Sequence, residues 1–76
     1  MNKPRRKELQ AIYDLISEAK ERLEAVRDEE EDYKDNMPEN LQSSERYERA
    51  EEIVDNLDEV IDELDDILET IEEACE

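Results

Sequence analysis

The feature that most constrains this chain is an apolar repeat between Tyr47 and Cys75. Its apolar residues recur at alternating steps of three and four, which is the a and d pattern of a heptad on one side of an α-helix. We place Tyr47 at position a. The seam is then Tyr47, Ala50, Val54, Leu57, Ile61, Leu64, Leu68, Ile71 and Cys75. The g position before each later a is apolar as well, and is filled by Ile53, Val60, Ile67 and Ala74.

A second apolar repeat fills the first third of the chain and has the same steps. Its members are Leu9, Ile12, Ile16, Ala19, Leu23 and Val26, with Tyr13 and Leu15 beside them. Pro4 suits the first turn of a helix, and the segment around Pro38 interrupts helical geometry. We predict one helical-hairpin domain over residues 1–76, with helices over about 4–33 and 44–75 and a connection over about 34–43. The fold class is all-α, an antiparallel two-helix, coiled-coil-like hairpin.

The composition agrees with long amphipathic helices, because 49% of the residues are charged and glycine is absent. A chain of 76 residues buries little apolar surface by itself. One cysteine and no histidine leave neither a disulfide within the chain nor a metal to stabilise it. The apolar g positions lie beside the seam, where two helices do not cover them. We therefore expect self-association, as a homodimer that forms a four-helix bundle.

The charges at the e positions predict a register for the hairpin. We expect the pairs Arg27–Glu51, Lys20–Asp58, Tyr13–Asp65 and Arg6–Glu72, with seam layers from Leu9 on Ile71 to Val26 on Val54.

Local signals predict the ends of the helices. Carboxylates oppose the helix dipole at a C-terminus, so we expect fraying over residues 28–32 unless a basic group lies nearby. Asn36 and Glu39 resemble a capping box for a short turn, and Ser43 or Ser44 caps the second helix. Met37 and Leu41 are expected to fold over the open end of the hairpin.

The sequence predicts no enzyme, no cofactor and no metal site. There is no histidine, and the acidic segments lack the order of an EF-hand loop. No apolar run reaches the roughly 20 residues of a membrane span, and no signal peptide is evident, so we expect a soluble cytoplasmic protein. Cys75 has two interpretations, a buried apolar residue of the seam or the site of an intermolecular disulfide.

The charge is very unevenly distributed along the chain. Residues 1–27 carry a net charge of +2 and residues 28–76 a net charge of −19. The large negative charge disfavours direct binding to nucleic acid and to anionic membranes, and we expect neither. From Ala50 to Glu76 there are thirteen acids and no basic residue.

Two candidate surfaces remain, both mainly on the second helix. The first is an acidic face that either binds a basic protein surface or only keeps the bundle soluble; its candidate residues are Glu51, Asp55, Asp58, Glu59, Asp62, Asp65, Asp66 and Glu69. The second is an apolar stripe for self-association or a partner, formed by Leu15, Ile53, Val60 and Ile67.

The segment from Arg27 through Asn36-Met37-Pro38-Glu39 to Glu48 resembles a protein family. It is similar to the short acidic helical-hairpin proteins of bacteriophages and prophages of Gram-positive bacteria, and the resemblance extends over about residues 20–76. It implies a phage setting in the cytoplasm of a host, and it brings no functional residues.

Two hypotheses follow. In the first, the chain is a phage-type interaction protein that binds a nucleic-acid-handling or host-defence protein, as a DNA mimic that inhibits it. The alternative is a structural or accessory bundle protein that uses its apolar stripe.

Overall fold

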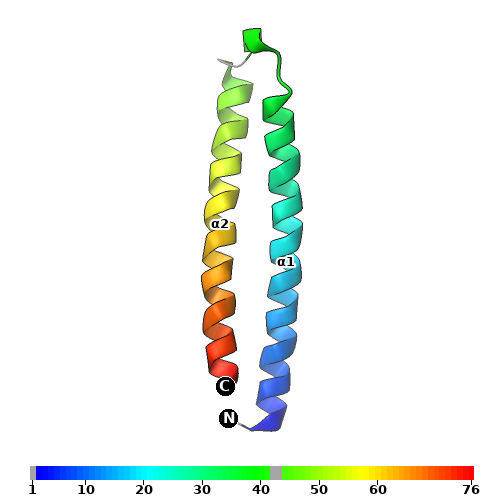
Figure 1. Cartoon of the computed structure of the whole chain (residues 1–76), viewed down its shortest axis with the longest axis vertical. Helices are drawn as coiled ribbons and strands as arrows, with labels where there is room; N and C mark the ends of the chain where they lie inside the picture. The colour runs from blue at the N-terminus through cyan, green and yellow to red at the C-terminus, as the bar shows by residue number, and fades with distance from the viewer. Residues whose placement is uncertain (1, 42–43) are drawn as a thin grey trace.

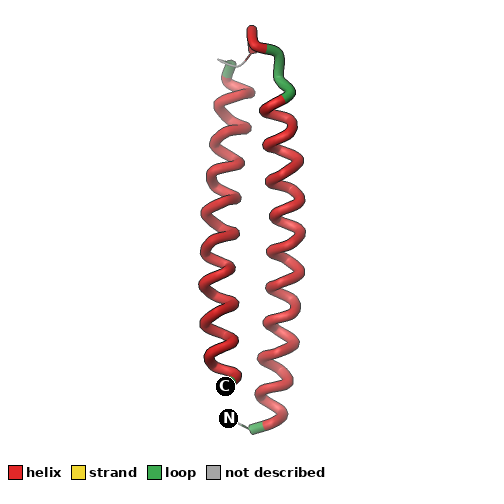
Figure 2. The backbone as a smooth tube through the Cα atoms, viewed as in Figure 1, coloured by secondary structure: helices red, strands yellow, loops and turns green. Residues whose placement is uncertain are grey.

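The computed structural model describes residues 2–41 and 44–76, which form two long α-helices and one short 3-10 turn. Helix α1 spans Lys3–Asp35, the 3-10 turn η1 spans Glu39–Leu41, and α2 spans Glu45–Cys75. The two helices lie side by side and antiparallel, so both ends of the chain lie at the same end of a rod of 60 × 14 × 13 Å (Figures 1 and 2). The predicted all-α antiparallel hairpin is confirmed.

Helix α1 begins with a side-chain cap and runs through the acidic segment without a break. The Oδ1 atom of Asn2 accepts a hydrogen bond from the backbone N–H of Arg5 at 3.0 Å, and Pro4 lies in the first turn. The expected fraying over residues 28–32 is absent, because the helix continues to Asp35. Lys34 lies in the last turn, where a positive charge interacts favourably with the helix dipole.

Helix α2 is capped by Ser44, which is one of the two cap residues that the sequence predicted. The Ser44 hydroxyl accepts a hydrogen bond from the N–H of Tyr47 at 3.3 Å and donates one to the carbonyl of Leu41. Glu45 and Glu48 occupy the first turn, where acids favour helix formation. The other candidate cap, Ser43, lies outside the described residues, as does Gln42.

The connection between the helices differs from the prediction in two details. Asn36 caps the C-terminus of α1, its N–H donating to the carbonyl of Asp32 at 3.0 Å, instead of opening the short turn. Met37 is buried as expected, but Leu41 is exposed. Leu41 ends η1, which projects beyond both helices (Figure 1), so its side chain has little apolar surface to cover.

The core of the hairpin is built mainly by α2. Its buried residues belong to the predicted seam, and with Met37 the buried set is Ala50, Val54, Ile61 and Leu68. Within Lys3–Asp35 no residue is buried. Most of the half-buried positions of α1 fall at alternating steps of four and three, and include Leu9, Tyr13, Ile16, Lys20, Leu23 and Arg27. Helix α1 therefore turns its a and e positions toward α2.

The predicted seam of α1 is wrong at its d positions. Ile12, Ala19 and Val26 are exposed, whereas the side chains of Lys20 and Arg27 are only 23% and 26% exposed. The long aliphatic stems of lysine and arginine can cover apolar surface while their charged groups reach the rim. Turning α1 in this way lets both cations bond to acids of α2, and it moves three apolar side chains out of the hairpin.

The predicted register is wrong by one heptad. Arg27 pairs with Asp58 and Lys20 with Asp65, each seven residues further along α2 than expected. At the chain ends, Arg6 donates to the carbonyl of Glu76 rather than meeting Glu72. Figure 1 shows the same offset, since α2 begins beyond the end of α1 and α1 begins beyond the end of α2. Because acids recur at the e positions, a shift of seven residues still gives opposite charges.

Candidate interaction surfaces

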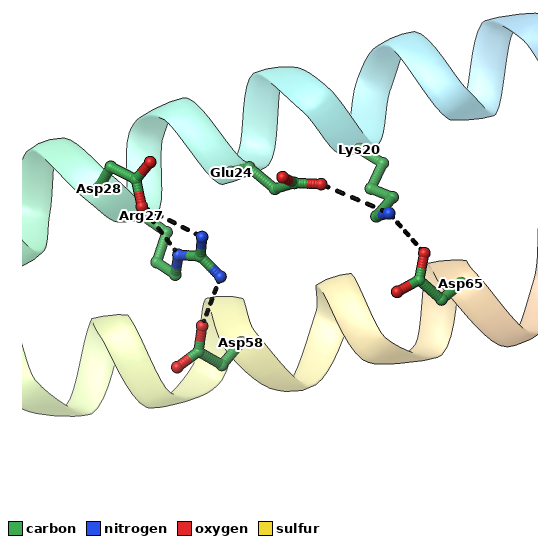
Figure 3. Close-up of polar contacts among 6 residues, drawn as sticks. All are labelled: Lys20, Glu24, Arg27, Asp28, Asp58 and Asp65. Carbon is green, nitrogen blue, oxygen red and sulfur yellow. Dashed lines mark hydrogen bonds and ion pairs between the residues drawn. The ribbon is translucent and has the colours of Figure 1, made fainter.

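One edge of the hairpin is closed by a row of ion pairs (Figure 3). The Nη1 atom of Arg27 donates to the Oδ1 atom of Asp58 at 2.9 Å, and its Nε and Nη2 atoms donate to Asp28 at 3.2 and 3.1 Å. The Nζ atom of Lys20 lies 2.5 Å from Asp65 and 3.4 Å from Glu24. Each cation therefore bridges a carboxylate of its own helix and one of the other helix.

These pairs stabilise the charged forms of both cations. The hydrogen bond to Asp65 raises the pKa of Lys20 above its ordinary value, and the partial burial of the amine opposes that effect. The hydrogen bonds to Asp58 and then to Asp28 likewise raise the pKa of Arg27. The acids are still half exposed, so these contacts orient the helices more than they stabilise them.

The opposite edge of the hairpin is apolar. In an antiparallel pair of helices, the e positions of both helices border one side of the seam and the g positions border the other. The ion pairs join e positions, so the g residue Leu15 of α1 and the g residues of α2 share the other edge. There Leu15 is 65% exposed, Val60 and Ile67 are exposed, and Ile53 is half-buried.

The turned α1 adds its d positions to this edge. We call the exposed set the apolar strip; it consists of Ile12, Leu15, Ala19 and Val26 of α1 with Val60 and Ile67 of α2. Within it lies an open groove of about 360 Å³. The groove is lined by Leu15, Glu18, Ala19, Arg22, Leu23 and Val26. Glu18 and Arg22, which flank the small Ala19, form an ion pair at 2.8 Å.

Sequence reasoning missed three members of the apolar strip, Ile12, Ala19 and Val26, because it assigned them to the seam. The a and e positions of α1 form a second regular stripe that contains Tyr13, Lys20 and Arg27. The acids at the e positions of α2 were the signal that could have shown that α1 turns this stripe inward. Tyr33, one heptad after Val26, is exposed too.

The acidic face of α2 is narrower than the sequence predicted. Asp58 and Asp65 point toward the cations of α1 (Figure 3). The other six predicted residues are exposed, and we call them the acidic surface: Glu51, Asp55, Glu59, Asp62, Asp66 and Glu69. Near the start of α2 a shallow groove of about 410 Å³ is lined by acids and one amide, from Glu48, Glu51, Glu52, Asp55 and Asn56.

Two further features concern ligands and membranes. Among residues 2–41 and 44–76, no three histidine, cysteine or acidic side chains come together as they would around a metal ion. Neither helix holds an apolar stretch long enough to cross a membrane in the part of the chain that the structure describes. Cys75 is a free, half-buried thiol at the end of α2.

Comparison of the chain with protein-family models, with curated proteins and with solved structures gave no match.

Proposed function

We propose that this chain is a non-enzymatic, phage-type interaction protein that acts in the host cytoplasm. Its acidic surface binds a basic surface of a nucleic-acid-handling or host-defence protein, and inhibits that protein as a DNA mimic. The observation that carries the proposal is the acidic surface of α2, where six exposed carboxylates line one continuous helix and no basic residue follows Arg49.

The density of charge supports this choice over solubility alone. A net charge of −17 spread along a rod of 60 Å amounts to about one charge per 3.5 Å, as 60 divided by 17 gives. A single DNA strand carries one negative charge per ~3.4 Å. Solubility requires no such density, and helices that are only solubilised commonly alternate acids with bases in stabilising i,i+4 pairs.

The rigidity of α2 also supports the proposal that the acidic surface binds a basic partner. A helix rises ~1.5 Å per residue, so acids seven residues apart, such as Asp55, Asp62 and Glu69, repeat every ~10 Å along one axis. Charges held on a continuous helix are already arranged before a partner arrives, so binding orders few side chains. A basic groove that tracks a nucleic-acid backbone is the partner that such a rod would fit electrostatically.

The test is capture of partners from a lysate of a Gram-positive host, with the immobilised full chain, at low and high salt. We expect a basic nucleic-acid-binding protein that is lost at high salt and is displaced by a short DNA duplex. The triple variant Asp62→Asn, Asp66→Asn and Glu69→Gln should reduce its recovery at least tenfold, because it removes three exposed charges from the acidic surface.

The matched control removes three exposed charges from α1 instead, with Glu8→Gln, Asp14→Asn and Glu21→Gln. This control should retain the partner, since net charge falls equally in both variants. Asp58 and Asp65 are left unchanged in both, because their loss would disturb the hairpin. A partner that resists both salt and duplex DNA would exclude mimicry.

A second function is favoured by a separate observation, the exposed apolar strip. In this alternative the chain is a structural or accessory protein, the strip is its interface, and the acids only keep it soluble. Binding would then persist at high salt and be lost in Val60→Asp or Ile53→Asp. The triple acidic-surface variant would bind as well as the wild type.

A further inference from the structure

We propose that a second copy of this chain covers the apolar strip, with the two α1 helices packed antiparallel about a two-fold axis. The product is a four-helix bundle with both α2 acidic surfaces on its outside. This inference rests on the second function above, for which it names the partner and the geometry. It does not depend on DNA mimicry.

The hairpin by itself leaves most of the apolar side chains of α1 exposed, while two charged side chains face α2. Lys20 and Arg27 are held against α2, whereas Leu15 is 65% exposed and Val26 is 51% exposed. An exposed leucine alone needs no explanation, but a row of apolar residues along one edge of both helices marks an interaction site. A helix with apolar residues at a, d and g has more apolar surface than a two-helix seam can cover.

The charge distribution indicates which part of the molecule another copy can approach. Residues 1–27 carry a net charge of +2, against −19 for the remainder. The acidic surface of one copy repels that of another, so two copies meet with least repulsion along about the first three quarters of α1. Most of the apolar strip, from Ile12 to Val26, lies on that segment.

The ends of α1 select the antiparallel orientation. Its first turns carry Lys3, Arg5, Arg6 and Lys7, and its last turns carry the acidic run 28–35, with six acids and one lysine. The helix dipole disfavours both of these charges, since it favours acids at the N-terminus and bases at the C-terminus. Among the described residues, no ion pair involves the four N-terminal cations.

Antiparallel α1 helices place the basic end of each copy against the acidic run of the other, and do so twice. A parallel pair would put like charges together at both ends. Within its own chain the basic end has one such contact, from Arg6 to the main-chain oxygen of Glu76 at 3.2 Å. The antiparallel orientation adds opposite charge from the other copy at both ends of α1.

The groove on the apolar strip has the features of a self-complementary contact. A two-fold interface uses the same patch on both copies, so that patch must hold both a projection and a recess. The groove is lined by the large, exposed side chains of Leu15 and Val26 and by the small Ala19, which lies between them in the sequence. The groove also carries one acid and one base, Glu18 and Arg22, one helical turn apart. Antiparallel copies reverse their order, so each faces its opposite.

The first experiment is sedimentation equilibrium of the full chain over a concentration series. We expect twice the monomer mass of 9.1 kDa. The double variant Leu15→Glu and Val26→Glu should sediment as a monomer, with helical content measured in parallel by circular dichroism. Leu41→Glu is the matched control, an exposed leucine outside the apolar strip, and should remain a dimer.

The second experiment tests the orientation by reversing charge at each end of α1. One variant carries Lys3→Glu, Arg5→Glu and Lys7→Glu, and another carries Glu29→Lys, Glu30→Lys and Glu31→Lys. Each should raise the dimer dissociation constant at least tenfold, and a chain with all six changes should return to within about threefold of the wild type. Each reversal suits the helix dipole, so α1 itself is not weakened.

The second of these variants separates local pairing from overall repulsion. It lowers the net charge from −17 to −11, so general repulsion would predict a tighter dimer, whereas antiparallel pairing predicts a weaker one. A tighter dimer, or no effect of either reversal, would overturn the orientation. A wild-type chain that sediments as a monomer would overturn self-association, but would leave the strip as a site for a different protein, which the Val60→Asp capture experiment tests.

Discussion

Two charged side chains of α1, Lys20 and Arg27, are half-buried against α2, whereas several apolar side chains of α1 are exposed. Lys20 and Arg27 lie across the seam, and each joins a carboxylate of α2 to one of α1. Their stems cover apolar surface, while their charged groups keep hydrogen bonds that water would otherwise supply. The contact between the helices is therefore partly electrostatic. The ion pair of Lys20 with Asp65 depends on the protonation of the lysine.

The stability of the hairpin should therefore fall in alkaline solution. Because Asp65 raises the pKa of Lys20, the pair contributes fully below the ordinary lysine value of 10.5 and loses its contribution as the pH rises through the higher folded value. Urea unfolding between about pH 8 and 11.5 measures this. Lys20→Met lacks the titrating group, so its decline should be smaller than that of the wild type. Equal declines would show that the pair is not linked to folding.

The buried apolar residues of α2 carry the packing of the hairpin. Ile61 is 6% exposed, so Ile61→Ala should lower the free energy of unfolding by about 2–3 kcal/mol, from lost burial and a residual cavity. Val60 is its exposed neighbour, and Val60→Ala should change stability by no more than about 0.5 kcal/mol. Both are measured by urea unfolding of a dilute sample, where self-association does not contribute. Similar losses in both variants would contradict the seam of α2.

The two helices differ as elements in what fixes their ends and their faces. Helix α2 has a serine cap, acids in its first turn and an apolar seam that the structure buries. Helix α1 has an asparagine cap but carries charges at both ends that the helix dipole disfavours, and it buries no residue. Its orientation about its own axis is set by the cations at e, and its exposed apolar face is available to a partner.

Substitutions at Ser44 test how much the cap contributes to the stability of α2. Ser44→Ala removes the acceptor for the N–H of Tyr47 and should cost about 1 kcal/mol of stability. Ser44→Asp keeps the acceptor and adds a negative charge at the helix N-terminus, but a carboxylate cannot donate to the carbonyl of Leu41 as the serine hydroxyl does. Its stability should therefore lie between those of Ser44→Ala and the wild type. Thermal unfolding followed by circular dichroism compares the three chains. If Ser44→Asp lost as much as Ser44→Ala, the capping bond would not matter.

For the whole molecule, the main electrostatic effect is repulsion among its own charges. A net charge of −17 on a thin rod opposes the compact state, and the few ion pairs between α1 and α2 offset only part of that repulsion. The same repulsion keeps acidic surfaces of different copies apart, and directs association to the less charged α1.

Added salt should therefore stabilise the protein. The screening length shortens from ~30 Å at 0.01 M to ~3 Å at 1 M, which removes repulsion along the rod and weakens the ion pairs as well. Because like charges greatly outnumber ion pairs, we expect the melting temperature to rise by several degrees over this range of sodium chloride. A melting temperature that falls would mean that the ion pairs of Lys20 and Arg27 dominate stability.

The sequence by itself determined the elements, their order and the seam of α2. The alternating steps of three and four from Tyr47 to Cys75 permit only a helix with one apolar face. Pro38 and Ser44 mark the connection and the second start, so two helices of similar length must form a hairpin. The acids that make up the acidic surface could be named for the same reason, since any helix places them outside the seam.

Only the tertiary structure decided the rotation of α1 and the register of the pair. A heptad pattern repeats every seven residues, so sliding α2 by one heptad leaves apolar facing apolar and bases facing acids. Arg27 finds an acid in either register, at Glu51 or at Asp58. In the folded chain Arg27 pairs with Asp58. The rotation of α1 was undetermined for a similar reason, because Leu9, Ile16 and Leu23 belong to both of its stripes. Contact with α2 chose the stripe whose cations reach Asp58 and Asp65, and so left the apolar strip exposed.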